Sequence, residues 1–215
     1  GVDRLVRMTA GATDNRTVSL PAFERLAAKK RCWTDPLLLL HTFLDLVRRL
    51  SPPRCEQPVA AYLTERLHAL DISDIEQDAC GNLVARVPAT DPQGTRLMFT
   101  AHMDCVYPGG SAPVEPVFRA SGVIAANGKN SLGADDKAGI AAILATLEYI
   151  QRIRLPHGEL RVVFTVQEEL GYRGIKQIPA RILNGVHLVI SRALAQFYTS
   201  QWKGYFTLVE LRRRS

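Results

Sequence analysis

Apolar segments of two lengths alternate through the middle of the chain, and this alternation constrains the fold more than any other feature. Runs of strand length occupy residues 97–101, 160–166 and 186–190. Residues 139–150 instead carry apolar side chains at helical spacing: Ile140, Ile143, Leu144, Leu147 and Ile150. Strands that alternate with helices are typical of layered α/β proteins. The sequence therefore predicts an α/β fold, a three-layer α/β/α sandwich with a mixed, mostly parallel sheet.

Turn and proline signals divide the flanking segments into further elements. Prolines at the first helical position predict helices that begin near residues 36 and 58. The turn signal Gly81-Asn82 predicts a β-hairpin between two short strands. The other expected elements are a helix over 21–30, hairpin strands at 72–77 and 83–87, a long loop over 107–131 with short strand pieces such as 123–125, and a helix over 174–183.

The distribution of charge argues against a nucleic-acid groove. The chain of 215 residues has a formal charge of +6, but residues 1–31 and 192–215 each carry +4, whereas residues 32–191 carry −2. A nucleic-acid site would need basic residues clustered on the folded face. We therefore expect no nucleic-acid partner, and we expect no membrane partner because no apolar run approaches the ~20 residues of a spanning helix. Without a signal pattern at the start, a cytoplasmic location is expected.

Four cysteines are widely spaced and form no Cys-x-x-Cys pair, so neither a thiolate zinc site nor a disulfide framework is expected. A different set of donors follows the apolar segments: His102 and Asp104, Asp135 with its neighbour Asp136, and the adjacent pair Glu168 and Glu169. In open α/β sheets, ligands bind beyond the carboxyl ends of the strands. Imidazole and carboxylate donors suit zinc, with manganese or cobalt as alternatives.

The spacing within each block suggests a division of roles. His102 and Asp104 are two residues apart, so in an extended segment they point the same way, and Asp104 can accept the second ring N–H of His102. Of the adjacent Glu168 and Glu169, one can coordinate a metal while the other takes a proton from a bound water. Taken singly, each block also has a structural interpretation: a surface hydrogen bond, a helix cap or a solvated strand end.

These blocks also carry a resemblance to a known family. The segments Ala-His-Met-Asp (101–104), Leu-Gly-Ala-Asp-Asp-Lys-Ala-Gly-Ile-Ala (132–141) and Phe-Thr-Val-Gln-Glu-Glu-Leu-Gly (164–171) resemble those of the M20 metallopeptidases. Within that family they are most similar to the peptidase T-like branch, the tripeptide aminopeptidases. The likeness covers roughly residues 37–190 and implies a zinc-exopeptidase-like catalytic domain.

The resemblance implies a site with two zinc ions and a short peptide as substrate. In this pattern His102 binds one metal, Asp135 bridges both, and Glu169 binds the other. Asp104 orients His102, and Glu168 is the general base for a metal-bound water that attacks the peptide bond. The pattern also implies a cis peptide bond between Asp135 and Asp136.

The sequence departs from the family pattern in two places. The family has an Asp where this chain has Ser191-Arg192, and its last ligand is a His in a later region that also holds a lid or dimerisation domain; both are expected to be absent here. His187 is not expected to substitute. We accordingly expect a poorly ordered lead-in over 1–34, a partial catalytic domain over 35–191 and a divergent basic tail over 192–215.

The missing ligands leave three functions open. The chain is expected to be a metal-dependent peptide hydrolase whose activity is impaired. One alternative is an inactive remnant that binds metal weakly, and another is a deacylase of amino acids from the same family. The preferred peptide, the native metal and the oligomeric state are left open by the sequence.

Overall fold

The computed structural model describes residues 6–7, 16–28 and 35–191 of the chain. Its main sheet has five strands in the order β3-β4-β8-β5-β9. They are β3 (Asp74–Gln77), β4 (Leu83–Val87), β8 (Leu160–Thr165), β5 (Leu97–His102) and β9 (Leu188–Ser191). The predicted basic tail lies outside the described residues.

The sheet is mixed, as predicted, but its parallel pairings are half of the total rather than the majority. Strand β5 runs parallel to both β8 and β9. Strand β4 is antiparallel to β3, with which it forms the predicted hairpin, and also to β8. The difference arises because a tight hairpin forces its second strand to reverse, and β8 then pairs with that reversed strand.

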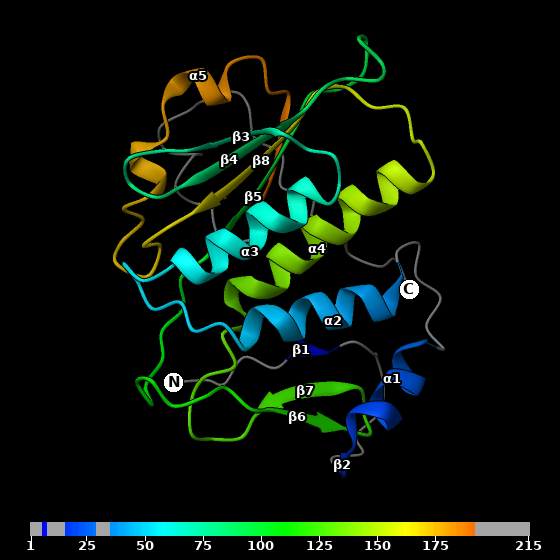
Figure 1. The fold of residues 1–215 in the computed structure, drawn as a ribbon, viewed down its shortest axis with the longest axis vertical. Helices are drawn as coiled ribbons and strands as arrows, with labels where there is room; N and C mark the ends of the chain where they lie inside the picture. The colour runs from blue at the N-terminus through cyan, green and yellow to red at the C-terminus, as the bar shows by residue number, and fades with distance from the viewer. Residues whose placement is uncertain (1–5, 8–15, 29–34, 192–215) are drawn as a thin grey trace.

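Helices cover both faces of the sheet, which confirms the three layers. On one face lie α3 (Gln57–His68) and α4 (Ala134–Arg152), and α2 (Pro36–Val47) packs against α4 (Figure 1). On the other face, α5 (Ala180–Leu183) contributes Ile182 to a smaller core. Successive residues of the strands alternate between the two cores, since Leu83 and Ala85 face the large helices while Val84 lies with Ile182.

The helix boundaries follow from local chemistry. The side chain of Asp35 accepts a hydrogen bond from the backbone N–H of Leu37 at 2.8 Å, so it caps α2 as its position before a proline predicts. The single helix expected over 174–183 is instead a 3₁₀ turn, η1 (Ile175–Gln177), followed by α5. Pro179 separates them because it cannot donate the backbone hydrogen bond that a continuous helix needs. No described helix is both apolar enough and long enough to span a bilayer.

A second, four-stranded sheet lies on the far side of α2 from the main sheet (Figure 1). Its order is β1 (Val6–Arg7), β7 (Val123–Ala126), β6 (Pro116–Arg119) and β2 (Thr17–Val18). The short strand pieces expected within the loop over 107–131 are thus two paired strands of this sheet. Helix α1 (Leu20–Ala28), which corresponds to the helix expected over 21–30, packs Phe23 against Phe118 with ring centroids 5.1 Å apart.

This packing gives part of the lead-in a fixed place in the fold. Phe23 and Ala27 are each 1% exposed, so α1 presents a buried apolar face. The described part of residues 1–34 is therefore more structured than its polar, basic composition suggests, because its few apolar residues meet partners about a hundred positions away in sequence. The domain boundary itself stays a prediction.

Candidate metal centre

Two neighbouring parallel strands bring the predicted donors to one rim of the main sheet. His102 is the last residue of β5 and pairs in register with Thr165, the last residue of β8. The glutamate pair follows Thr165 after only two residues. Because parallel strands end on the same side, His102 and the Glu168–Glu169 loop face a common space.

His102 is 2% exposed, and its ring is fixed by the backbone. The Nδ1 atom lies 2.9 Å from the backbone oxygen of Asp104. A carbonyl oxygen only accepts, so Nδ1 carries the proton and Nε2 presents its lone pair in the neutral ring. The carboxylate of Asp104, expected to accept this hydrogen bond, lies farther away, with Oδ1 at 3.6 Å from Nδ1. Asp104 therefore orients His102 mainly through its main chain.

The carboxylate of Asp104 is directed instead at the glutamate loop. Its Oδ1 accepts the backbone N–H of Glu168 and its Oδ2 accepts that of Glu169, both at 2.9 Å. Asp104 is fully buried. Burial alone would raise the pKa of its carboxyl group, but the neighbouring His102 ring and these two N–H groups outweigh burial and lower the pKa. Asp104 thus stays ionised and joins the two sides of the site.

The start of α4 supplies Asp135. The residue before the helix, Gly133, has a positive φ of 66°, and a Cβ there would lie 3.1 Å from the sulfur of Cys105. The peptide bond between Asp135 and Asp136 is cis, as the resemblance implies. Asp135 Oδ1 lies 3.4 Å from Nε2 of His102. The first turn of α4 therefore places a half-buried carboxylate directly beside the free nitrogen of His102.

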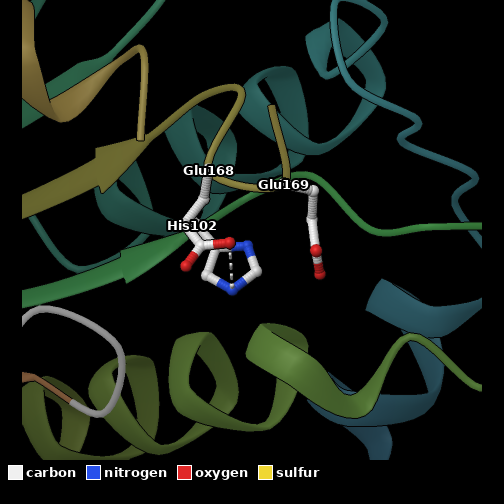
Figure 2. Close-up of side chains that lie close together, drawn as sticks. All are labelled: His102, Glu168 and Glu169. Carbon is white, nitrogen blue, oxygen red and sulfur yellow. Dashed lines mark ion pairs between the residues drawn. The ribbon is translucent and has the colours of Figure 1, made fainter. Parts of the chain in front are cut away.

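Glu168 and Glu169 complete the donor set. Figure 2 shows the Glu168 carboxylate next to the His102 ring, and Glu168 Oε2 is 4.0 Å from Nε2. Glu169 is exposed and extends from the same loop. One ligand atom from each of His102, Glu168 and Glu169 can be chosen so that all three lie within 4.8 Å of one another. Of the six donors named from the sequence, all except Asp136 are thus gathered around the His102 ring.

One pair of these donors has the spacing of two ligands on a single tetrahedral metal ion. Two atoms bound to one tetrahedral zinc ion at about 2.0–2.1 Å lie about 3.3 Å apart, which is close to the 3.4 Å between Asp135 Oδ1 and His102 Nε2. Burial lowers the pKa of His102, but Asp104, Asp136 and Glu168 together raise it above its ordinary value. This concentration of negative charge around a buried imidazole is an environment that favours a cation.

A buried lysine next to the site was not predicted from the sequence. Lys137 is fully buried, and its Nζ donates to the backbone oxygen of Arg49 at 2.5 Å and to the hydroxyl of Tyr107 at 2.7 Å. Burial lowers its pKa to about 8. The lysine ties the first turn of α4 to the end of α2 and to the segment after Asp104. Its place in an Asp-Asp-Lys run resembles that of a solvated residue at a helix start, so no local signal indicates its burial.

Cys105 and two further histidines, His187 and His41, lie outside the donor set. Cys105 is buried beside the site, with its sulfur 3.3 Å from the backbone oxygen of Asp135, and burial raises its pKa to about 11. His187 precedes β9 at the opposite end of the sheet from His102, and its Nδ1 accepts the backbone N–H of Arg96 at 3.1 Å. It is therefore no substitute ligand. His41 is half-exposed and pairs with Glu24 at 3.1 Å.

Comparison with known proteins finds peptidases among the similar chains. A tripeptidase from Staphylococcus aureus superposes with a TM-score of 0.69 and 33% identity over 74% of this chain and 44% of that chain. Protein YqjE of Bacillus subtilis, itself uncharacterised, is 34% identical over 147 residues, 65% of this chain and 38% of that protein. Peptidase T of Escherichia coli is 29% identical over 155 residues, 58% of this chain and 38% of that enzyme. The matched region is thus similar to peptidase T and to this tripeptidase.

A family model described as M42 glutamyl aminopeptidase also matches, over residues 114–201. That match covers less than half of the chain and leaves out His102 and Asp104. The chain spans 38% of the length of its Bacillus and Escherichia relatives. Within the peptidase T-like region, the roles of individual residues are taken up below as proposals.

Proposed function

We propose that this peptidase T-like domain hydrolyses short peptides with zinc held by His102, Asp135 and Glu169. The observation that carries the proposal is the convergence of three sequence-distant blocks on Nε2 of His102, with Asp135 Oδ1 at 3.4 Å and Glu168 Oε2 at 4.0 Å. Bound zinc would act as a Lewis acid that makes a water molecule acidic enough to lose a proton near neutral pH. Two ions are proposed for a complete site, with manganese or cobalt as alternatives.

In this proposal the chain's own residues bind, orient and move the proton. Glu168 is the general base, because its carboxylate lies within the donor cluster, 4.0 Å from Nε2 of His102. Asp104 keeps the loop fixed while the proton moves, and its main-chain oxygen holds the tautomer of His102 that leaves Nε2 for metal binding. The protonated Glu168 can then give its proton to the leaving amine.

Tripeptide hydrolysis by the zinc-supplemented chain tests this assignment. Glu168→Gln should lower kcat by roughly 10²–10⁴, the usual contribution of a general base, while zinc content stays at the wild-type level. Glu65→Gln on the exposed face of α3 is the matched control and should change neither quantity. Wild-type turnover that survives Glu168→Gln would contradict the proposed base.

A metal-binding remnant without activity is the second candidate, and the residue at the end of β9 favours it. Ser191 pairs in register with Thr100, which lies two residues before His102. The family pattern has a ligand Asp where this chain has Ser191-Arg192. Zinc bound at less than one ion per chain, with no hydrolysis of tripeptides, would support the remnant. Hydrolysis of N-acyl amino acids but not of tripeptides would instead support a deacylase. A cytoplasmic location and the absence of nucleic-acid partners stay predictions.

A further inference from the structure

Four consecutive backbone N–H groups, from Val166 to Glu169, are each held by a buried side chain from elsewhere in the chain. Asp104 accepts the last two of them, as described above. The N–H of Val166 donates to Oδ1 of Asn82 at 3.0 Å, and that of Gln167 donates to Oε1 of Glu56 at 3.0 Å. Loops after a strand end ordinarily satisfy such groups with water or with their own side chains. Here the loop that carries the glutamates is bound along its whole first half.

Glu56 has a local alternative that it does not use. It occupies the N-cap position of α3, where a side-chain oxygen would ordinarily accept an N–H from the first turn, yet it makes no such bond. Its Oε1 instead accepts from Gln167, 111 residues away, and from the backbone of Arg54 at 3.0 Å. Only 3% of Glu56 is exposed. Burying a carboxylate costs free energy unless hydrogen bonds compensate, and these two N–H groups supply that compensation.

Asn82 secures the base of the same loop. Besides accepting from Val166, its Nδ2 donates to the backbone oxygen of Gly174 at 2.9 Å and to Oδ2 of Asp78 at 2.7 Å. The backbone N–H of Gly174 in turn donates to the oxygen of Val166 at 3.1 Å, which closes the loop. A Cβ at Gly174 would lie 2.5 Å from Oδ1 of Asn82, so this close approach requires glycine. Both ends of the loop are therefore fixed to one side chain.

We propose that Glu56 and Asn82 are positioning residues for the metal centre, acting through the backbone of residues 166–169 on Glu168 and Glu169. The inference rests on the proposed function, since it assigns a purpose to holding these two glutamates still. Side chains outside the ligand set that orient ligands typically change metal affinity or activity by about 10- to 100-fold when removed. Neither residue contacts the donor cluster directly, so the effect travels through main-chain hydrogen bonds.

The experiment uses the full chain and two readouts, amide hydrogen exchange and zinc affinity measured by competition with a chelator. Glu56→Ala removes the acceptor and should speed exchange at Gln167 and its two successors at least tenfold, with about a tenfold loss of zinc affinity. Glu56→Gln keeps an acceptor oxygen in place and should stay within about threefold of wild type in both readouts. Glu65→Ala, on the exposed side of the same helix, is the control and should change neither.

Unchanged exchange at residues 167–169 in Glu56→Ala would overturn the proposal, as would equal losses in Glu56→Ala and Glu56→Gln. If Glu56→Ala does not fold, Glu56→Asp keeps the charge but shortens the reach, and it should show the same faster exchange confined to this loop. Exchange is measured without zinc, so it decides the positioning role even if the wild-type chain binds no zinc. The absence of zinc binding by the wild-type chain would overturn the proposed function but not the positioning role.

Discussion

The two sides of the metal centre are supported in different ways. On the β5 side, His102 ends a strand with a partner on each edge, and its ring is oriented by a backbone oxygen only two residues away. On the other side, the glutamates stand on a loop whose backbone is held by side chains that lie 64 to 111 residues away in sequence. One half of the site is thus built locally, and the other depends on the assembled fold.

This difference indicates which side of the site is more sensitive to substitution. A strand in the middle of a sheet keeps its place through many ladder hydrogen bonds, so a single side chain near His102 has little influence on the ring. The glutamate loop has a few specific acceptors, and the loss of one leaves a backbone N–H without its buried partner. Substitutions on the loop side should therefore cost more than substitutions on the strand side.

The largest effect is expected from Asp104→Asn, because Asp104 joins the two sides of the site. An amide has one acceptor oxygen, so it can accept from only one of Glu168 and Glu169 and would turn its NH₂ group toward the other. We expect a loss of about 4 kcal/mol in the free energy of unfolding, from one unsatisfied buried donor and the weaker remaining hydrogen bond. Urea denaturation measures it, with exposed Asp74→Asn, which loses only an ion pair of 3.7 Å, as control. A loss equal to that of the control would contradict the joining role of Asp104.

A smaller loss should follow from Asn82→Ala on the loop side. This change removes hydrogen bonds to Val166, Gly174 and Asp78 and leaves a cavity at a fully buried position. About 3 kcal/mol of unfolding free energy should be lost. Asn127→Ala in an exposed loop is the matched control and should cost less than about 1 kcal/mol. Thermal unfolding of both variants would show whether the loop side is as sensitive as its contacts suggest.

The smallest effect is expected on the strand side, from Thr100→Val in β5. The Thr100 hydroxyl is buried, and no described residue offers it a hydrogen-bond partner. Replacing the hydroxyl with a methyl group of similar size should leave stability unchanged or raise it by up to about 1 kcal/mol. A loss above about 2 kcal/mol would show that the β5 side also depends on specific polar contacts, and would remove the contrast between the two sides.

Local pattern predicted the main sheet well. The end of β5 at His102 and the hairpin around Gly81-Asn82 depend on alternation and turn chemistry within a few residues, so they could be read directly. The small sheet could not be predicted in this way. Its strands β1 and β2 have two residues each and pair with partners about a hundred positions away. Segments so short carry no periodicity, and only the assembled tertiary structure determines their pairing.

The candidate site likewise contains residues that the sequence indicated and residues that it did not. The donors at His102, Asp135 and the glutamate pair follow strand ends or precede a helix, so their position in the pattern indicated them. Glu56 and Asn82 gave no such signal, because a Glu before a helix and an Asn in a turn are ordinary capping and turn residues. Their hydrogen bonds with the backbone of Val166 and Gln167 can be seen only in the folded structure.

Zinc titration of the full chain by calorimetry tests the central claim most directly, that three distant blocks of sequence form one cation site. The wild-type chain and the exposed-histidine control His68→Ala should bind zinc alike, whereas His102→Ala should bind at least tenfold more weakly. Equal binding by His102→Ala and wild type, or no binding by wild type, would contradict the shared site.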